Sequence, residues 1–194
     1  FVVKYNSSGT KQWTKQLGTS SGDPAFGVAT DSSGNVYVTG YTEGGLDGNT
    51  SAGKADLFVV KYNSSGTKQW ANQLGTWDTD FANVVATDSS GNVYVTGSTY
   101  RNFDGNTSAG NADLFVVKYN SSGTKQWTKQ LGTSSTDTAN GVTTDSSGNV
   151  YVAGGTYGGL DGNTSAGVND LFIVKYNSSG TKQWTNQLGS SSRD

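Results

Sequence analysis

Acidic and amide side chains recur at a fixed spacing in LDGNTSAGKADLF at 46–58, and they are the first candidates for chemistry. Asp47 and Asn49 alternate as do the first ligands of a calcium loop, and Asp56 follows downstream. Oxygen atoms of these side chains suit Ca²⁺. The segment recurs as FDGNTSAGNADLF and LDGNTSAGVNDLF, which adds six candidate ligands: Asp104, Asn106, Asp113, Asp161, Asn163 and Asp170.

The pattern departs from the EF-hand calcium loop in three respects. It lacks the second and third acids, the Gly at the sixth position and the terminal Glu. With so few charges, calcium would bind weakly. The alternative, which we favour, is a loop in which the Asp side chain accepts hydrogen bonds from backbone N–H groups. The expectation is therefore no cofactor, with weak calcium binding as the alternative.

A second group of candidate residues lies in two segments of the middle of the chain, around 77–81 and 100–103. Aromatic rings beside Arg and Asn can bind a sugar ring or a protein partner through stacking and paired hydrogen bonds. The alternative is that Trp77 and Phe81 fill the gap to an adjacent structural unit. The predicted ligand-binding residues are Trp77, Asp78, Phe81, Tyr100, Arg101 and Asn102.

Several function classes are disfavoured by what the sequence lacks. It contains neither His nor Cys, so a Ser–His–Asp or Cys–His triad and the usual zinc sites cannot form. Asp78 and Asp80 could serve glycoside hydrolysis, but Asp80 recurs in register as Asp23 and Asp137, which favours a structural role. We expect this segment not to be an enzyme.

Charge and hydropathy argue against two kinds of partner. The net charge is −2, and the basic residues are scattered singly rather than gathered in the stripe that nucleic-acid binding requires. No apolar stretch approaches the roughly 20 residues of a membrane span. We expect neither nucleic-acid binding nor membrane insertion.

The elements that position these residues are repeated every 57 residues. The stretch KYNSSGTKQW occurs at 4–13, 61–70, 118–127 and 175–184. The chain 1–194 therefore reads as a single domain with repeats at 1–57, 58–114 and 115–171 and a partial repeat at 172–194.

Each repeat contains four runs with the β-branched and aromatic composition of strands. NSSG and DSSGN turns connect them in pairs, and the Asn or Asp and the Gly of these turns favour tight antiparallel hairpins. The predicted fold class is all-β. Four short strands per repeat match one blade of a β-propeller, so the chain holds three blades and one orphan outer hairpin. In the middle repeat the strands, from inner to outer, are predicted at 83–87, 92–98, 113–119 and 124–131.

The repeats differ mainly in two connecting loops. Copies one and two differ at positions 14–15, 20–27, 41–46 and 54 and their equivalents, whereas the DSSGN and NSSG turns are invariant. In a propeller the two variable loops emerge on the same rim of the disc. Binding is therefore expected on that rim.

The ordered phrases DSSGNVYVTG, LDGNTSAG, DLFVVKY and GTKQW resemble the bacterial β-propeller repeat family abbreviated SBBP. The resemblance covers the whole chain. It implies a seven-bladed propeller of the kind found mostly in large secreted or surface-associated bacterial proteins, and it implies no catalytic residue set.

The predicted function is a non-catalytic propeller scaffold of a bacterial secreted or cell-surface protein. It binds a protein or carbohydrate partner through the variable loop face. One alternative is a structural protein whose chains associate into rings or fibres, with homo-oligomers expected if the chain is complete. Another alternative is the propeller domain of a larger enzyme.

Overall fold

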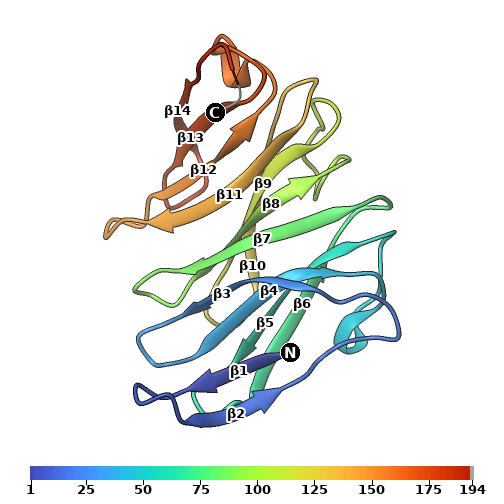
Figure 1. Ribbon diagram of the computed structural model, residues 1–194, viewed down its shortest axis with the longest axis vertical. Coiled ribbons are helices and arrows are strands. Elements are labelled where there is room, and N and C mark those ends of the chain that lie inside the picture. The colour runs from blue at the N-terminus through green and yellow to red at the C-terminus, as the bar shows by residue number, and fades with distance from the viewer. Residues whose placement is uncertain (193–194) are drawn as a thin grey trace.

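Alternating β-branched and aromatic residues form antiparallel strands, and the Asn/Asp–Ser–Gly turns end them. The computed structural model describes residues 1–192, which contain fourteen strands and two short 3-10 turns, η1 (Leu46–Gly48) and η2 (Leu160–Gly162) (Figure 1). The N-terminal hairpin consists of β1 (Val2–Tyr5) and β2 (Lys11–Lys15). Sheet 1 consists of β3 (Ala25–Thr30), β4 (Val36–Thr42), β5 (Asp56–Tyr62) and β6 (Lys68–Leu74). Sheet 2 consists of β7 (Asp80–Thr87), β8 (Val93–Thr99), β9 (Asp113–Tyr119) and β10 (Lys125–Leu131). Sheet 3 consists of β11 (Asp137–Thr144), β12 (Val150–Thr156), β13 (Asp170–Tyr176) and β14 (Lys182–Leu188).

Within each sheet, strands that follow one another in the sequence pair antiparallel. This confirms the prediction of one four-stranded antiparallel sheet per repeat. The inner strand of sheet 2 is longer than predicted and begins at Asp80 rather than at 83. The extension arises because Asp80 pairs with Thr99 on β8, and a β-bulge between Ala82 and Val84 keeps the rest of the strand in register.

The repeated stretch KYNSSGTKQW forms the outer hairpin of each sheet, as predicted. In sheet 1 the Oδ1 atom of Asn63 accepts hydrogen bonds from the backbone N–H groups of Ser65 (3.1 Å) and Thr67 (2.8 Å). Gly66 has φ 81°, a conformation that glycine adopts without steric cost. The turn is therefore an Asn-stabilised turn that fixes where β5 ends and β6 begins.

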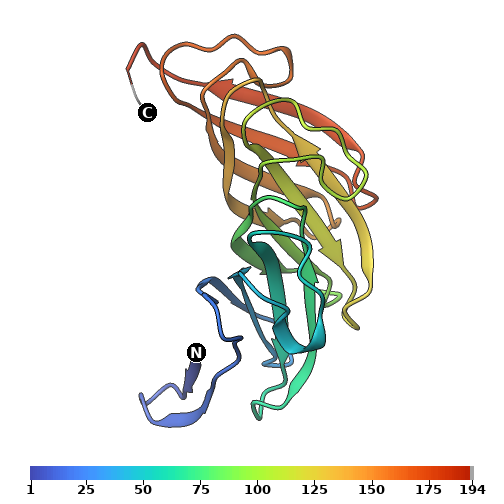
Figure 2. The ribbon, with the colours of Figure 1, turned by 90° about the vertical axis from the view of Figure 1, so that its right-hand side faces the viewer.

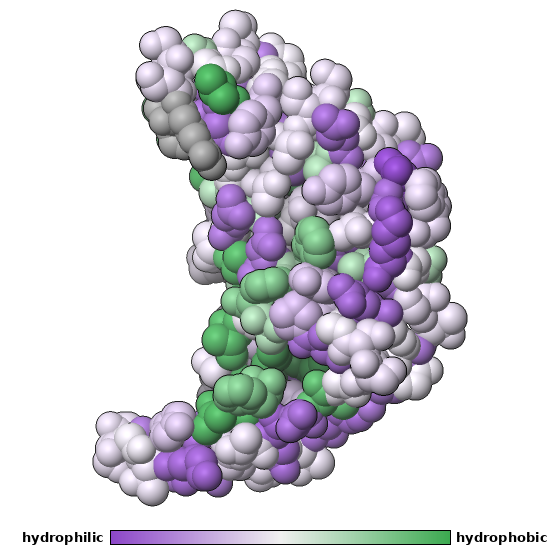
Figure 3. Space-filling view, turned by 45° about the vertical axis from the view of Figure 1, so that its right-hand side comes forward, coloured by the Kyte–Doolittle hydropathy of each residue, from purple (hydrophilic) through white to green (hydrophobic). Residues whose placement is uncertain are grey.

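The three sheets and the hairpin pack side by side into a crescent (Figure 2). The inner strands β3, β7 and β11 line the concave side, and the outer strands lie on the convex side (Figures 1 and 2). Apolar side chains gather in the hollow of the crescent (Figure 3). The sheets do not close into a ring.

Each hydrophobic core lies between neighbouring sheets rather than within one. The core between sheets 1 and 2 joins Tyr37, Leu57 and Val59 to Phe115 and Val117. Burial of aromatic and branched residues between successive sheets supplies most of the driving force for this packing, at roughly 1.5–3 kcal/mol per fully buried side chain. The sheets depend on their neighbours for stability.

The connecting loops contain no long helix. In the described part of the chain, no helix has the length and apolar character to cross a membrane.

Candidate functional site

The two variable loops of neighbouring repeats meet at one end of the sheets. The loop after β4 and the loop after β6 are joined by a parallel bridge between Ala55 and Thr79. Close by, Lys54 Nζ lies 2.9 Å from Asp78 Oδ1. The invariant turns lie at the opposite end, where Asp88 and Asp145 border one shared surface depression. The prediction that the variable loops share one rim is confirmed.

On this rim, Trp77 and Arg101 form a stacked pair. The guanidinium carbon of Arg101 lies 4.3 Å from the centroid of the Trp77 ring, which is 63% exposed. Arg101 Nη2 lies 2.6 Å from Asp78 Oδ2, and Arg101 Nη1 donates to the Tyr100 carbonyl at 2.9 Å. Stacking and ion pairing together fix the orientation of the guanidinium, and the guanidinium in turn holds the indole.

Asp78 connects the two repeats electrostatically. A hydrogen bond from Lys54 and the positive charges of Lys54 and Arg101 outweigh burial and lower the pKa of Asp78 below its usual value. Asp78 therefore stays ionised at neutral pH. The single carboxylate of Asp78 therefore faces two cations, Lys54 and Arg101, and the three side chains together carry one net positive charge.

A groove of about 350 Å³ runs beside the stacked pair. Asn102 contributes an amide to it: its Oδ1 accepts a hydrogen bond from Ser108 N at 2.8 Å, while its Nδ2 has no partner within residues 1–192. The groove thus offers an aromatic face and hydrogen-bonding groups side by side. Its lining residues are Trp77, Tyr100, Arg101, Asn102, Ser108 and Gly110.

Four of the six residues predicted for ligand binding, Trp77, Tyr100, Arg101 and Asn102, line this groove, and Asp78 forms an ion pair with Arg101. Phe81 borders a neighbouring surface depression together with Asp78, Thr79 and Tyr100. Its ring centroid is 4.7 Å from that of Tyr41, on sheet 1. Phe81 therefore packs against the adjacent sheet, as the alternative interpretation of these aromatic residues expected. Trp77 does not, because its ring is mostly exposed. Phe103, the aromatic that ends the variable segment 100–103, is fully buried, 4.9 Å from the Phe115 ring centroid, because it occupies the core position of Leu46 and Leu160.

Each of the residues predicted as calcium ligands is bound to a different partner within the protein. Asp47 pairs with Lys68, and Asn49 Nδ2 donates to the Leu46 carbonyl at 2.7 Å. Asp56 Oδ2 instead accepts hydrogen bonds from Ala52 N and from Gln73 Nε2, both at 2.7 Å.

The later repeats use the same partners. Asp104 and Asp161 pair with Lys125 and Lys182, and Asn106 and Asn163 each donate to a backbone carbonyl three residues earlier. Asp113 and Asp170 each accept a hydrogen bond from a backbone N–H group and one from a glutamine. In residues 1–192, no three acidic side chains are grouped as a metal site would require.

Comparison with known proteins bears on the fold that carries this groove. The sequence matches the family described as SBBP: Beta-propeller repeat over residues 12–47, 69–104 and 126–161. These matches cover 108 of the 194 residues. The chain belongs to the beta-propeller repeat family.

Two curated proteins are similar to this beta-propeller repeat chain. One is an uncharacterized WD repeat-containing protein, L264, of Acanthamoeba polyphaga mimivirus, 28% identical over 91% of this chain and 16% of that protein. The other is the regulatory protein FlaEY of Caulobacter vibrioides, 27% identical over 85% of this chain and 20% of that protein. The chain thus spans about a fifth or less of the length of these relatives.

A contact that sequence reasoning missed recurs in every beta-propeller repeat of the chain. The Oδ1 atoms of Asp56, Asp113 and Asp170 are buried and have no hydrogen-bond partner. Each lies against a glycine, so that a Cβ atom on Gly75 would stand only 2.0 Å from Asp56 Oδ1. The available sequence signal was the invariant Leu-Gly pair that ends each outer strand.

Asp80 and Asp137, at equivalent positions of two repeats, are also fully buried carboxylates. Asp80 Oδ2 accepts hydrogen bonds from Thr76 N at 2.5 Å and Thr76 Oγ1 at 2.9 Å, and Oδ1 accepts one from Thr99. Burial raises the pKa of Asp80, and the nearby charge of Asp56 adds to this effect. Through these hydrogen bonds Asp80 holds the loop in place, in line with the structural role predicted for it.

Proposed function

We propose that this beta-propeller repeat chain is a non-catalytic binding scaffold whose groove on sheet 2 receives a neutral carbohydrate chain. The observation that carries the proposal is the exposed Trp77 ring, held in place by Arg101 at 4.3 Å. A large apolar side chain fixed in an exposed position is typical of a binding site, because its burial by a partner gains free energy with little ordering cost.

The chemistry of the groove favours a sugar. Arg101 covers one face of the indole, which leaves the other face for the apolar C–H face of a pyranose ring. The unpartnered Nδ2 of Asn102 and the hydroxyl group of Tyr100 can bond sugar hydroxyls. Arg101 is paired with Asp78, and Lys54, the second cation beside Asp78, is not among the residues that line the groove. The other lining side chains are neutral and suit the hydroxyl groups of a neutral sugar.

A protein partner is the second candidate for the same surface. Trp, Tyr and Arg are the residue types that contribute most binding energy at protein interfaces, and Trp77, Tyr100 and Arg101 lie together here. A protein would cover Trp77 and Tyr100 at once, whereas a single sugar ring stacks on one of them.

Titration with a panel of neutral oligosaccharides, followed by calorimetry and tryptophan fluorescence, tests the first candidate. Trp77→Ala should abolish binding and leave the melting temperature within about 2 °C, because the ring is mostly exposed. The matched control is Tyr157→Ala, which removes an exposed aromatic at the position equivalent to Tyr100 in the repeat without the Trp–Arg pair. Equal binding by Trp77→Ala and the unaltered chain would refute the carbohydrate site.

Three further statements belong to this proposal. The repeats are part of a seven-bladed ring, the protein is secreted or lies on the cell surface, and the segment performs no catalysis. The resemblance to propeller repeats of large secreted bacterial proteins supports the first two. The absence of His and Cys, together with the ion pairing of Asp78, supports the third. Protease treatment of intact source cells, followed by detection with an antibody against the repeat, tests the location: protection of the epitope until lysis would refute it.

A further inference from the structure

A second depression adjoins the groove at Trp77. It has a volume of about 220 Å³ and is lined by Asp78, Thr79, Phe81 and Tyr100. Tyr100 also lines the groove of about 350 Å³, so that the two hollows share this residue as a wall. The Tyr100 backbone N–H donates to the Thr79 carbonyl at 3.3 Å, which ties this wall to the segment before β7. The groove and the second depression are therefore neighbouring parts of one surface.

The aromatic rings around this surface are not a general feature of the repeat. Trp77 stands where the first and third repeats both carry Ser, and Phe81 stands where they carry Pro and Thr. Tyr41, whose ring centroid lies 4.7 Å from that of Phe81, is replaced by Ser and Gly in the later repeats. The three rings thus gather between sheets 1 and 2, although the repeat fold forms elsewhere in the chain without them. Exposed aromatic groups that the fold does not require favour a role in binding.

Phe81 is placed to take part both in packing and in binding. Its ring packs against Tyr41 on β4, yet the residue is only half-buried, and it borders the second depression. A ring that a neighbouring sheet already holds in place loses little conformational entropy when a ligand covers it. Phe81 therefore has the same relation to the second depression as Trp77 has to the groove.

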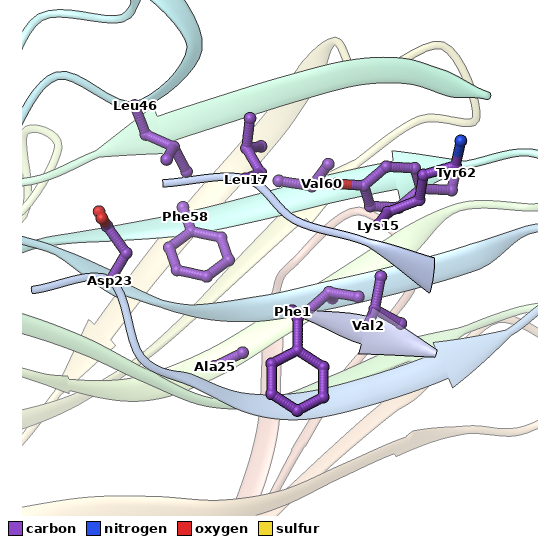
Figure 4. Close-up of a pocket in the computed structure, with 11 residues that line it drawn as sticks. Phe1, Val2, Lys15, Leu17, Asp23, Ala25, Leu46, Phe58, Val60 and Tyr62 are labelled. Atoms are coloured by element: carbon purple, nitrogen blue, oxygen red, sulfur yellow. The ribbon is translucent and has the colours of Figure 1, made fainter. Parts of the chain in front are cut away.

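A separate apolar cavity elsewhere in the chain does not extend this surface. It lies between the N-terminal hairpin and sheet 1, where Leu17, Phe58 and Val60 contribute to its lining (Figure 4). These side chains belong to the hydrophobic core between the hairpin and the sheet. The volume of the cavity is about 30 Å³, which has room for about two water molecules and not for a sugar ring.

We propose that the groove and the second depression together bind a run of several sugar residues of a linear neutral polysaccharide, with Phe81 as a second stacking platform. The proposal rests on the carbohydrate site proposed above and adds the length of the ligand. One sugar residue stacks on Trp77, and the chain continues past Tyr100 to Phe81.

The chemistry of a linear polysaccharide suits this arrangement. Its successive pyranose rings each present an apolar C–H face, so that one chain can contact aromatic rings one after another. The hydroxyl groups of Thr79 and Tyr100 lie at the second depression and can bond sugar hydroxyls. A disaccharide would occupy the groove alone and leave Phe81 uncovered.

Calorimetry with neutral oligosaccharides of increasing length tests the proposal. The probes are the disaccharide, tetrasaccharide and hexasaccharide of the cello-, xylo-, manno- and malto-oligosaccharide series. In a series that binds, the affinity should rise by about tenfold from the disaccharide to the hexasaccharide, because the longer chain covers a second aromatic ring.

Two substitutions of Phe81 separate its ring from the rest of the site. Phe81→Thr should bind the disaccharide as the unaltered chain does and should lose the gain in affinity with length. Thr is the residue that the third repeat carries at this position, so the fold accommodates it. Phe81→Tyr keeps an aromatic ring and should retain the gain. Far-ultraviolet circular dichroism of each variant establishes that it is folded.

Tyr157→Glu is the matched control, because the first repeat carries Glu43 at the equivalent position and the third repeat lacks the Trp–Arg pair. This variant should show the same gain with length as the unaltered chain. Equal affinity for the disaccharide and the hexasaccharide, or a gain that survives in Phe81→Thr, overturns the second platform and leaves the carbohydrate site at Trp77 in place. Failure of every oligosaccharide to bind overturns both proposals.

Discussion

Gly132→Ala tests the buried Asp–Gly contact in the central sheet. A Cβ at Gly132 would lie 2.0 Å from Oδ1, 2.5 Å from Cγ and 2.9 Å from Cβ of Asp113. Real Cβ atoms do not approach other heavy atoms this closely, so the carboxylate must move. Asp113 is fully buried, and its Oδ2 accepts hydrogen bonds from Ala109 N at 2.8 Å and Gln130 Nε2 at 2.7 Å. Movement of the carboxylate breaks or lengthens both of them.

The expected loss of stability follows from these two bonds. A hydrogen bond to a charged group contributes about 1.5–3 kcal/mol, and overpacking of a core costs about 1–3 kcal/mol. Partial relaxation of the loop recovers some of this energy. We therefore expect Gly132→Ala to lower the free energy of unfolding by about 3–5 kcal/mol, which is among the larger effects of a single substitution.

Urea denaturation followed by tryptophan fluorescence measures the effect. The matched control is Gly141→Ala, since the nearest atom to a Cβ there is 3.9 Å away and the equivalent position in the second repeat is Val84. It should change stability by less than about 1 kcal/mol. In the double variant with Asp113→Ala, the cost of the added methyl group should largely disappear. A Gly132→Ala chain as stable as the Gly141→Ala chain would refute this account of the contact.

Three further substitutions or additions give expected outcomes. Phe103→Ala should cost about 3–5 kcal/mol because the ring is fully buried, whereas Phe103→Leu should cost less than about 1.5 kcal/mol, as measured by urea denaturation; similar costs for both would contradict the core assignment. At Asp88, burial favours a higher pKa, but hydrogen bonds from Asn92, Tyr94 and Ser90 lower it below 3.8. Because these hydrogen bonds favour the ionised carboxylate, Asp88 stabilises the folded chain. This stabilisation is present above pH 3.8 and is lost as the pH falls through the lowered pKa. Asp88→Asn should therefore destabilise the chain at pH 7, and the difference in melting temperature from the unaltered chain should narrow below pH 3.8; a difference independent of pH would count against this. Calcium at millimolar concentration should leave the melting temperature unchanged relative to a chelator, because Asp47 and Asp56 are held by separate partners; a rise would show that the loop rearranges around the ion.

The sheets and their order could be predicted from the sequence because the same strand and turn segments recur every 57 residues. The spacing of KYNSSGTKQW and DSSGN locates both hairpins, and a turn residue such as Asn63 acts through its own neighbours in the chain. Local hydrogen bonding of this kind is readable from the sequence. The start of β7 was missed because its first pairs depend on the bulge between Ala82 and Val84, which no composition rule marks.

The candidate site could be predicted only in part. Variation between repeats identified Trp77, Tyr100 and Arg101. Variation alone does not separate these residues from the buried Phe103, because a core position can also vary between Leu and Phe. The Arg101–Asp78–Lys54 arrangement joins three loops, and these residues are more than 20 positions apart in the sequence, so side-chain geometry decides it.

The packing of each sheet against its neighbours has a consequence for how the molecule unfolds. When each unit touches only its neighbours, stability is a sum of unit terms and nearest-neighbour terms. Sheet 2 has a neighbour on both sides, whereas sheet 3 has one within the chain. In a polypeptide of these 194 residues alone, amide protons of sheet 3 should therefore exchange with deuterium before those of sheet 2, although the two sequences are nearly the same. Position along the array, rather than local sequence, sets the order in which the sheets open.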